Sequence, residues 1–341
     1  MSSDVRAAIG RVVQGRDLSH AQMSAAMQAI LGGEATPAAI AGLAVAMRTK
    51  GETTEELFAA AEVMRQHSVK VELGSGRIVD TCGTGGDDSG TFNVSTAAAI
   101  VVAACGVTVA KHGNRAVSSR CGSADVLEAL GVTLDVPAER LREQVLRNHI
   151  CFMFAPIYHP AMRHAAVPRK ELGIRTFFNL LGPLTNPAGA NCQLLGVYDA
   201  TRLHQMAEVL ARLGSQRAWV VHGHGGMDEI SASGPTQVVK LANGNLQTFD
   251  LLPADFGIDT VEPSAIAGGD AKRNAEIIVH VLKGADDAYR HVVLINAAGA
   301  LCAAGECDNP KEGVQRAMQA IDSGAAWTCL QEWIRSSHQS P

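Results

Sequence analysis

The chain has 341 residues, of which 47% are hydrophobic and 18% charged, a composition typical of a globular protein and not of a disordered one. The formal net charge of −5 argues against a general basic surface for nucleic acid, so any anion site must be local. No run of about 18 apolar residues occurs and no basic-then-apolar leader opens the chain, so we expect neither membrane association nor export.

The first part of the chain carries only helical signals. Apolar residues recur at helical spacing, and Ser19 and Thr36 are placed to cap two helices. Thr53 with Glu56 has the form of a capping box in front of another helix. We therefore predict a small helical domain of residues 1–72.

From residue 77 onwards the pattern changes to short β-branched runs separated by helical segments. The predicted strands lie at residues 77–80, 107–110, 151–155, 193–197 and 219–221. Such alternation indicates parallel strands with crossover helices. The predicted fold class is therefore α/β, with a small α-helical domain beside a large domain whose central, mostly parallel sheet is flanked by helices.

Residues 240–246 predict a β-hairpin at a sheet edge, because Asn243 and Gly244 suit its tight turn. Helical periodicity returns at residues 272–301 and again at 314–333.

A proline- and glycine-rich interruption at residues 173–187 follows a helical stretch at 160–172. It indicates that the chain returns to the helical domain with a segment near residues 165–190. The α/β domain then consists of residues 73–164 and 191–341.

The cysteines show neither a CxxC pair nor zinc-like spacing with histidine. Several lie in apolar runs, which is typical of buried free thiols. We expect eight reduced cysteines and a cytoplasmic protein.

A glycine-rich turn follows the first predicted strand, with the sequence GTGGDDSGT at residues 83–91. An alanine-rich helix opens after it near Ser95 and Thr96. Glycines let backbone N–H groups approach an anion, and a helix N-terminus adds donors and positive potential. A lone GxGG would more often be an ordinary turn, but the hydroxyl groups of Thr91, Ser95 and Thr96 beside Asn93 favour a phosphate site. The spacing fits neither a P-loop nor a dinucleotide motif.

A second anion-binding loop is predicted at residues 111–123, where three cations, three serines and two glycines follow a strand. His112 is explained equally well as a packed or capping histidine, so it receives no proton-transfer role.

Carboxylates follow two of the strands. Asp87 and Asp88 would repel a bare pyrophosphate, which suggests a divalent cation or a ribose hydroxyl nearby. Asp228 and Glu229 would be solvated loop charges if isolated, but the carboxyl ends of parallel strands meet at one edge of a sheet. Hard oxygen ligands there predict Mg²⁺ and not zinc.

A dense basic segment occupies residues 169–176. Each of its cations is explained equally well as a surface charge at a helix end, whereas an arginine that faces the cleft would clamp a carboxylate.

Together these motifs resemble the anthranilate phosphoribosyltransferase family of tryptophan biosynthesis, over nearly the whole chain and in the family's order. The motifs are GTGGD at residues 83–87, NVST at 93–96, KHGN at 111–114, RKELGIRTFFN at 169–179, GPLTNP at 182–187 and the pair Asp228-Glu229.

The resemblance implies a nucleoside-phosphorylase-like fold, a homodimer formed through the helical domain, and transfer of phosphoribose from phosphoribosyl pyrophosphate to anthranilate. The residues implied for phosphoribosyl pyrophosphate are Gly83, Gly86, Asp87, Thr91, Asn93, Ser95, Thr96, Lys111, Ser119 and Ser123. The residues implied for anthranilate are Gly83, Asn114 and Arg169. Mg²⁺ would be held by Ser95, Asp228 and Glu229.

The expected chemistry needs no dedicated general base. Loss of pyrophosphate builds negative charge on the leaving group, which Mg²⁺ and backbone N–H groups stabilise. The aromatic amine is neutral at cytosolic pH, so positioning and electrostatics should dominate. Two alternatives remain. A nucleoside phosphorylase of the same fold is disfavoured by the acidic pair at Asp228, and a nucleic-acid-binding relative is disfavoured by the negative net charge.

Overall fold

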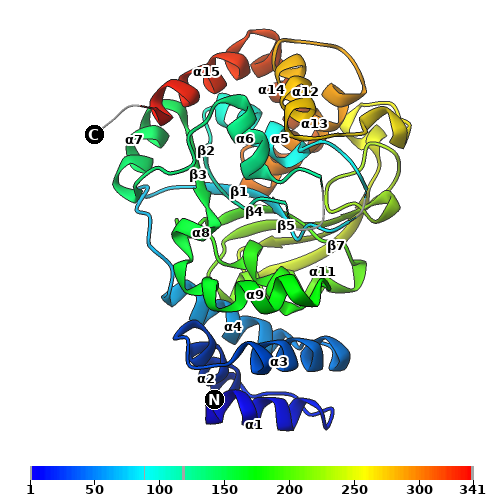
Figure 1. Ribbon diagram of the computed structural model, residues 1–341. Coiled ribbons are helices and arrows are strands. Elements are labelled where there is room, and N and C mark those ends of the chain that lie inside the picture. Colours follow the sequence, from blue (N-terminus) through cyan, green and yellow to red (C-terminus); the bar gives the residue numbers. More distant parts are fainter. Residues whose placement is uncertain (1, 88, 117–119, 339–341) are drawn as a thin grey trace.

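The computed structural model describes residues 2–87, 89–116 and 120–338. A small helical bundle stands below an α/β body in Figure 1. Among the described residues, no helix is long and apolar enough to cross a membrane.

The bundle opens the chain, as the sequence predicts. Its helices are α1 (Ser3–Val12), α2 (His20–Leu31), α3 (Pro37–Lys50) and α4 (Thr54–Gln66). The predicted caps are confirmed, because the side chains of Ser19, Thr36 and Thr53 each accept a backbone N–H at the start of a helix. The capping box of Thr53 and Glu56 is also present.

One sheet of seven strands, in the order β3-β2-β1-β4-β5-β6-β7, forms the centre of the α/β body. The strands are β1 (Ile78–Gly83), β2 (Thr108–Gly113), β3 (Ile150–Phe154), β4 (Cys192–Gly196), β5 (Arg217–Gly223), β6 (Thr236–Ala242) and β7 (Asn245–Leu251). The first five are parallel, and β6 and β7 are antiparallel, which confirms the mostly parallel sheet.

The predicted hairpin is also confirmed. Strands β6 and β7 are joined by Asn243 and Gly244, whose φ angles of 51° and 80° are the positive values that a tight hairpin turn requires. Strand β7 forms the edge of the sheet.

One prediction about β2 is wrong. The strand continues to Gly113 and does not end at residue 110, because it stays paired with β3 as far as Gly113 opposite Phe154. Lys111 and His112 are therefore strand residues and not loop residues.

Helices cover both faces of the sheet (Figure 1). The longer ones are α5 (Val94–Ala104), α6 (Ser123–Leu130), α7 (Ala138–Asn148), α9 (Arg163–Leu172), α11 (Leu203–Arg212), α12 (Ala271–Leu282), α13 (Ala288–Ala304), α14 (Pro310–Asp322) and α15 (Ala325–Ser337). The short ones are α8 (Ala155–Tyr158), α10 (Phe177–Leu181) and the 3₁₀ turns η1 (Pro160–Met162), η2 (Gly182–Leu184), η3 (Ala200–Arg202), η4 (His224–Gly226), η5 (Pro253–Phe256) and η6 (Pro263–Ile266). Both predicted C-terminal helical stretches are thus split into two helices each.

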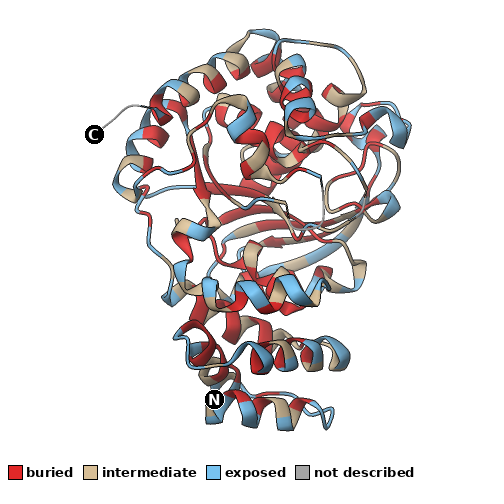
Figure 2. Ribbon diagram, in the orientation of Figure 1, coloured by how far each residue is buried: buried red, intermediate tan, exposed pale blue. Residues whose placement is uncertain are grey.

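The buried residues lie on the strands and on the inward faces of the helices (Figure 2). Helices α5 and α13 pack on one face of the sheet, where a large apolar core contains side chains of β1, β2 and β4. Helix α11 packs on the other face, and its core is continuous with that of the bundle.

The segment between β3 and β4 returns to the bundle. Helix α9 contacts α2 and α3, and α10 contacts α3 and α4. Phe177, Phe178 and Leu181 belong to the same apolar core as the bundle helices. These contacts are compatible with the predicted discontinuous domain, whose boundaries stay a prediction.

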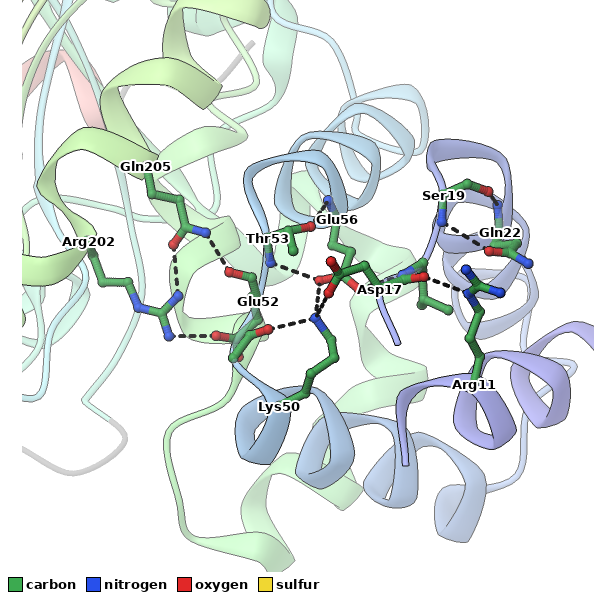
Figure 3. A network of polar contacts seen from close by, with 12 residues as sticks. Arg11, Asp17, Ser19, Gln22, Lys50, Glu52, Thr53, Glu56, Arg202 and Gln205 are labelled. Carbon is green, nitrogen blue, oxygen red and sulfur yellow. Dashed lines mark hydrogen bonds and ion pairs between the residues drawn. The ribbon is translucent and has the colours of Figure 1, made fainter. Parts of the chain in front are cut away.

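A polar network joins the bundle to the α/β body (Figure 3). Lys50 Nζ lies 2.7 Å from Asp17 Oδ1 and 2.9 Å from Oε2 of Glu56, which is fully buried. Between α3 and α4, the Glu52 carboxylate forms an ion pair with the guanidinium group of Arg202, just before α11, at 2.6 Å. The bundle is therefore joined to the turn before α11 by an ion pair and to α11 itself by apolar packing.

Candidate active site

The predicted loops meet at the carboxyl edge of the parallel strands. The strand order reverses direction between β1 and β4, the position at which open α/β sheets bind ligands. The glycine turn after β1, the end of β2 and the acidic loop after β5 all lie around it.

Close packing explains the glycines of the first turn. Gly85 and Gly86 have φ angles of 69° and 72°, which favour glycine. A Cβ on Gly83 would lie 2.2 Å from Oδ2 of Asp228. The Gly85 N–H donates to that same oxygen at 2.7 Å, so the turn and the acidic loop are built against each other.

Helix α5 points its N-terminus at the acidic loop. The helix begins at Val94 with Asn93 as its cap, so Ser95 lies in its first turn and is not the cap. The Ser95 N–H donates to Glu229 Oε1 at 3.2 Å. The Thr96 hydroxyl is buried and has no hydrogen-bond partner among the described residues. The unpaired Thr96 hydroxyl and the positive end of the helix suit an anion.

Lys111 brings a buried cation to this point. Its side chain is only 1% exposed, and its ammonium group donates to the carbonyl of Thr81 and, at 3.2 Å, to Ser95 Oγ. Burial lowers the pKa of Lys111, and the nearby carboxylate of Asp80 opposes that shift.

Three carboxylates crowd the other side of the turn. Asp87 Oδ2 accepts the backbone N–H of Asp228 at 3.4 Å. Burial and the neighbouring Asp87 raise the pKa of Asp228 to about 7, and burial and Asp228 raise the pKa of Glu229 well above its usual range. Such mutual repulsion is relieved when a cation binds between the carboxylates.

The donor set fits Mg²⁺. Within the described ranges, no three or more His, Cys, Asp and Glu side chains form a complete metal site. Mg²⁺ is usually bound by one or two carboxylates together with water and substrate phosphates, so Asp228, Glu229 and the Ser95 hydroxyl are sufficient.

The described ends of the loop after β2 are joined by a hydrogen bond. Asn114 is exposed and its carbonyl accepts the Ser123 hydroxyl at 3.3 Å, while Ser123 opens α6. Ser119 lies outside the described residues. The predicted roles of Asn114, Ser119 and Ser123 stay predictions.

Two predicted donor-binding residues also organise the backbone. The side chain of Asn93 donates to the carbonyl of Cys121 at 3.2 Å and accepts from Asn274 at 2.9 Å. Thr91 pairs with Ala267 in an isolated β-bridge. Both lie between Gly86 and α5, next to the proposed phosphate site.

Arg169 lies apart from these residues, in the last turns of α9. Its guanidinium group stacks on the ring of Phe178 at 5.6 Å. No carboxylate pairs with it in the part of the chain that the structure describes, and burial lowers its pKa. An unpaired, half-buried arginine is suited to a ligand carboxylate.

Six residues further on, Arg175 packs against Gly86 and over the ring of Tyr198, at 4.4 Å from its centroid.

His112, which the sequence explains equally well as a packed or capping histidine, is buried against His159, which the sequence analysis did not single out. The rings of His112 and His159 lie 4.9 Å apart, and burial lowers their pKa values to about 4 and about 3. His112 Nδ1 contacts the carbonyl of Gly182 at 3.2 Å. His112 Nε2 and both ring nitrogens of His159 have no hydrogen-bond partner within the described ranges. Both imidazoles are therefore neutral, and nothing in the sequence around His159 signals this contact.

The chain matches two models of one enzyme class. Residues 6–68 match "Glycosyl transferase family, helical bundle domain", and residues 75–327 match "Glycosyl transferase family, a/b domain". The fold and the site therefore define a glycosyl transferase.

Individual relatives narrow the class. The chain is 52% identical to the anthranilate phosphoribosyltransferase of Myxococcus xanthus, over 94% of this chain and 96% of that protein. The structure of the Thermus thermophilus enzyme matches with a TM-score of 0.92 and 42% identity, covering 97% of this chain and 99% of that one. The Saccharomyces cerevisiae enzyme, solved in complex with PRPP and Mg, matches with a TM-score of 0.90 and 31% identity over 99% of this chain and 98% of that one. The chain belongs to the anthranilate phosphoribosyltransferase family.

Proposed function

We propose that the edge between β1, β2 and β5 binds phosphoribosyl pyrophosphate and Mg²⁺, and that Arg169 presents anthranilate to it. The reaction transfers the 5-phosphoribosyl group to the amine of anthranilate, with loss of pyrophosphate, in tryptophan biosynthesis. The observation that carries the proposal is the convergence of a glycine turn, the α5 N-terminus and Lys111 on one point beside Asp228 and Glu229. The yeast relative solved with PRPP and Mg supports the same ligands here.

The donor is held by backbone and side-chain donors. N–H groups of Gly83 and Gly86, the first turn of α5 with Ser95 and Thr96, and Lys111 surround its phosphates. Thr91, Asn93, Ser119, Ser123 and Asp87 complete the contacts to the phosphates and the ribose. Fixed donors of this kind stabilise negative charge as it develops on the departing pyrophosphate, without reorganisation.

Asp228, Glu229 and the Ser95 hydroxyl hold Mg²⁺. When bound, the ion neutralises charge on the leaving pyrophosphate, a contribution of several kcal/mol in metal-assisted reactions. The carboxylates themselves orient the ion and keep the glycine turn in place through the Gly85 hydrogen bond.

Anthranilate is bound by Arg169, Asn114 and the backbone of Gly83. A guanidinium group pairs with a carboxylate through two parallel hydrogen bonds, which fixes the ring and points the amine at the ribose. The neutral amine needs no base before attack, and the neutral histidines His112 and His159 add no competing positive charge.

The protein acts as a cytoplasmic homodimer in this proposal. Val13 and Val45, on the bundle, are exposed by 64% and 38%, and a dimer formed through the helical domain would cover them. Eight free cysteines support a reducing compartment. Sedimentation of Val45→Lys beside the unsubstituted protein tests the dimer, which the charge should weaken; an unchanged dimer would place the interface elsewhere.

One assay tests the function. Anthranilate fluorescence should decrease when phosphoribosyl pyrophosphate and Mg²⁺ are both present, and it should stay constant when either is omitted. Phosphorolysis of a nucleoside without such a decrease would favour the nucleoside phosphorylase alternative. Salt-sensitive binding of mixed DNA without turnover would favour the nucleic-acid-binding one.

A further inference from the structure

The buried carboxylate of Asp80 has no part in the mechanism above. It lies within β1 and is fully buried, and a buried carboxylate is costly unless hydrogen bonds satisfy it. Oδ1 accepts the backbone N–H of His112 at 3.2 Å, Oδ2 accepts Asn186 Nδ2 at 2.8 Å, and the Cys82 thiol also hydrogen-bonds to the carboxylate. Asp80 therefore contacts β2 on one side and the segment after α10 on the other.

Asn186 completes this bridge. Its Nδ2 also donates to the carbonyl of Ala110 at 2.8 Å, and its Oδ1 accepts the backbone N–H of Ala188 at 2.9 Å. The side-chain amide is thus occupied by β1, β2 and its own turn. An amide placed this way fixes the separation of two backbones.

The bridge lies where β1 and β2 part. These strands pair at Ile78 with Thr108 and at Val79 with Val109. Beyond that point β1 stays paired with β4 through Gly83, and β2 stays paired with β3 through Gly113. Side chains satisfy the backbone groups that face the opening between the strands. Asp80 accepts the His112 N–H, and Asn186 donates to the Ala110 carbonyl.

Lys111 lies at the same opening. It follows Ala110 and precedes His112, the two residues whose backbone groups the bridge holds. Its ammonium group reaches the carbonyl of Thr81, the residue after Asp80, and then Ser95. The position of the Lys111 cation therefore depends on the distance between β1 and β2, which the bridge sets.

We propose that Asp80 and Asn186 are positioning residues, which hold β1 and β2 apart and thereby place Lys111 against the phosphates of the sugar donor. The proposal rests on the proposed donor site at Lys111. Neither residue belongs to the proposed donor contacts. Asn186 acts through the strand that carries Lys111, whereas Asp80 acts through that strand and through its negative charge near the Lys111 ammonium group.

The test measures donor binding and not turnover alone. Phosphoribosyl pyrophosphate with Mg²⁺ is titrated calorimetrically into the full-length protein and into Asp80→Asn, which keeps the size of the side chain and loses its charge. The donor should bind about tenfold to a hundredfold more weakly, the range for a lost charge-assisted contact. The KM for anthranilate should change by less than about threefold, because Arg169 is on another element.

Two further variants separate positioning from stability. Asn186→Ser removes both hydrogen bonds of Nδ2 and should show the same split between the two substrates. The matched control is Asn148→Ala, which removes an equally buried hydrogen bond, 2.7 Å long, between Asn148 and Ser336 far from the site. It should lower the melting temperature and leave the binding of both substrates unchanged.

A double-mutant cycle with Lys111→Met decides the outcome. If Asp80 acts through Lys111, adding Asp80→Asn to Lys111→Met should change donor affinity by less than about threefold. The positioning role would be overturned if the losses of donor affinity in the two single variants multiplied in the double variant. It would also be overturned if Asp80→Asn kept its donor affinity, or if both Asp80→Asn and Asn186→Ser failed to fold. Donor affinity that survives in Lys111→Met would instead refute the donor site itself.

Discussion

At the residue scale, short motifs predicted those site residues whose chemistry is local. The glycines near residue 85 and the acidic pair at Asp228 were identified because their chain neighbours already indicated a turn at a strand end. The structure adds that they pack on one another, with Asp228 occupying the space a Cβ on Gly83 would need. His159 and Asp80 were missed because their partners are remote in sequence and no local pattern marks them.

The cysteines illustrate the same limit. All eight are free, in agreement with the expectation from their spacing. The fold nevertheless brings Cys302 and Cys307 together, with 3.0 Å between their sulfur atoms, across the end of α13. Neither residue lies in a redox motif, so sequence spacing alone could not reveal the contact.

The acidic pair should be essential for activity and should lower the thermal stability of the metal-free protein. Asp228→Asn combined with Glu229→Gln should nearly abolish turnover, because a metal contributes several kcal/mol to leaving-group stabilisation. The same variant should melt at a higher temperature than the unsubstituted protein in EDTA, because it removes repulsion between buried carboxylates. Full turnover of the variant in EDTA-treated buffer would refute the metal site, and calorimetry checks the melting temperatures.

Arg169 should control anthranilate affinity. Arg169→Ala should raise the KM for anthranilate by about one to two orders of magnitude, since a charge-assisted hydrogen bond contributes roughly 1.5–3 kcal/mol. The KM for the donor should change much less. Lys170→Ala, at the exposed next position, is the matched control and should match the unsubstituted enzyme. A normal anthranilate KM with a lowered melting temperature would make Arg169 a structural cation.

At the element scale, caps and turns were the most predictable features. The starts of α2, α3 and α4 and the β6–β7 turn follow from side chains that satisfy nearby backbone groups. The predicted end of β2 was wrong because the length of a strand depends on its partner strand. The partner, β3, is about 40 residues further along the chain. Local preference cannot report such pairing.

The network of Figure 3 should stabilise the junction of α3 and α4. Glu56→Ala removes a helix cap and leaves Lys50 without its buried partner, so we expect a loss of about 3–5 kcal/mol in unfolding free energy. Glu55→Ala, which breaks only the half-exposed pair with Arg212, should cost less than about 1 kcal/mol. Urea denaturation of the two variants compares them; equal losses would contradict the importance of burial.

At the scale of the whole molecule, alternation of strand and helix signals predicted the fold class and the parallel sheet. The strand order was not predictable, because it depends on which way each crossover turns and on the long excursion through α9 and α10 between β3 and β4. The position of the site was equally unpredictable, because the site lies where the strand order reverses.

The pH dependence of stability should reveal the buried histidines. Burial lowers the pKa of His159 to about 3, while an unfolded histidine titrates near 6.5. The unfolded state therefore binds the proton first, and this contribution to stability is present above pH 6.5 and lost as the pH falls towards 3. The stability difference between the unsubstituted protein and His159→Gln should thus decrease by about 2 kcal/mol between pH 7.5 and pH 5. Denaturant titrations at the two pH values measure it, and a constant difference would contradict a neutral, buried His159.

The bundle's dependence on later segments also affects how the chain folds during synthesis. Helices α1 to α4 leave the ribosome first, yet their apolar core is completed by α10 and α11, which are translated up to roughly 150 residues later. At ordinary translation rates the nascent bundle waits roughly 10–30 s with its apolar surface exposed. During this interval it is a target for chaperones, and a fragment ending near residue 70 lacks the surfaces against which these helices pack.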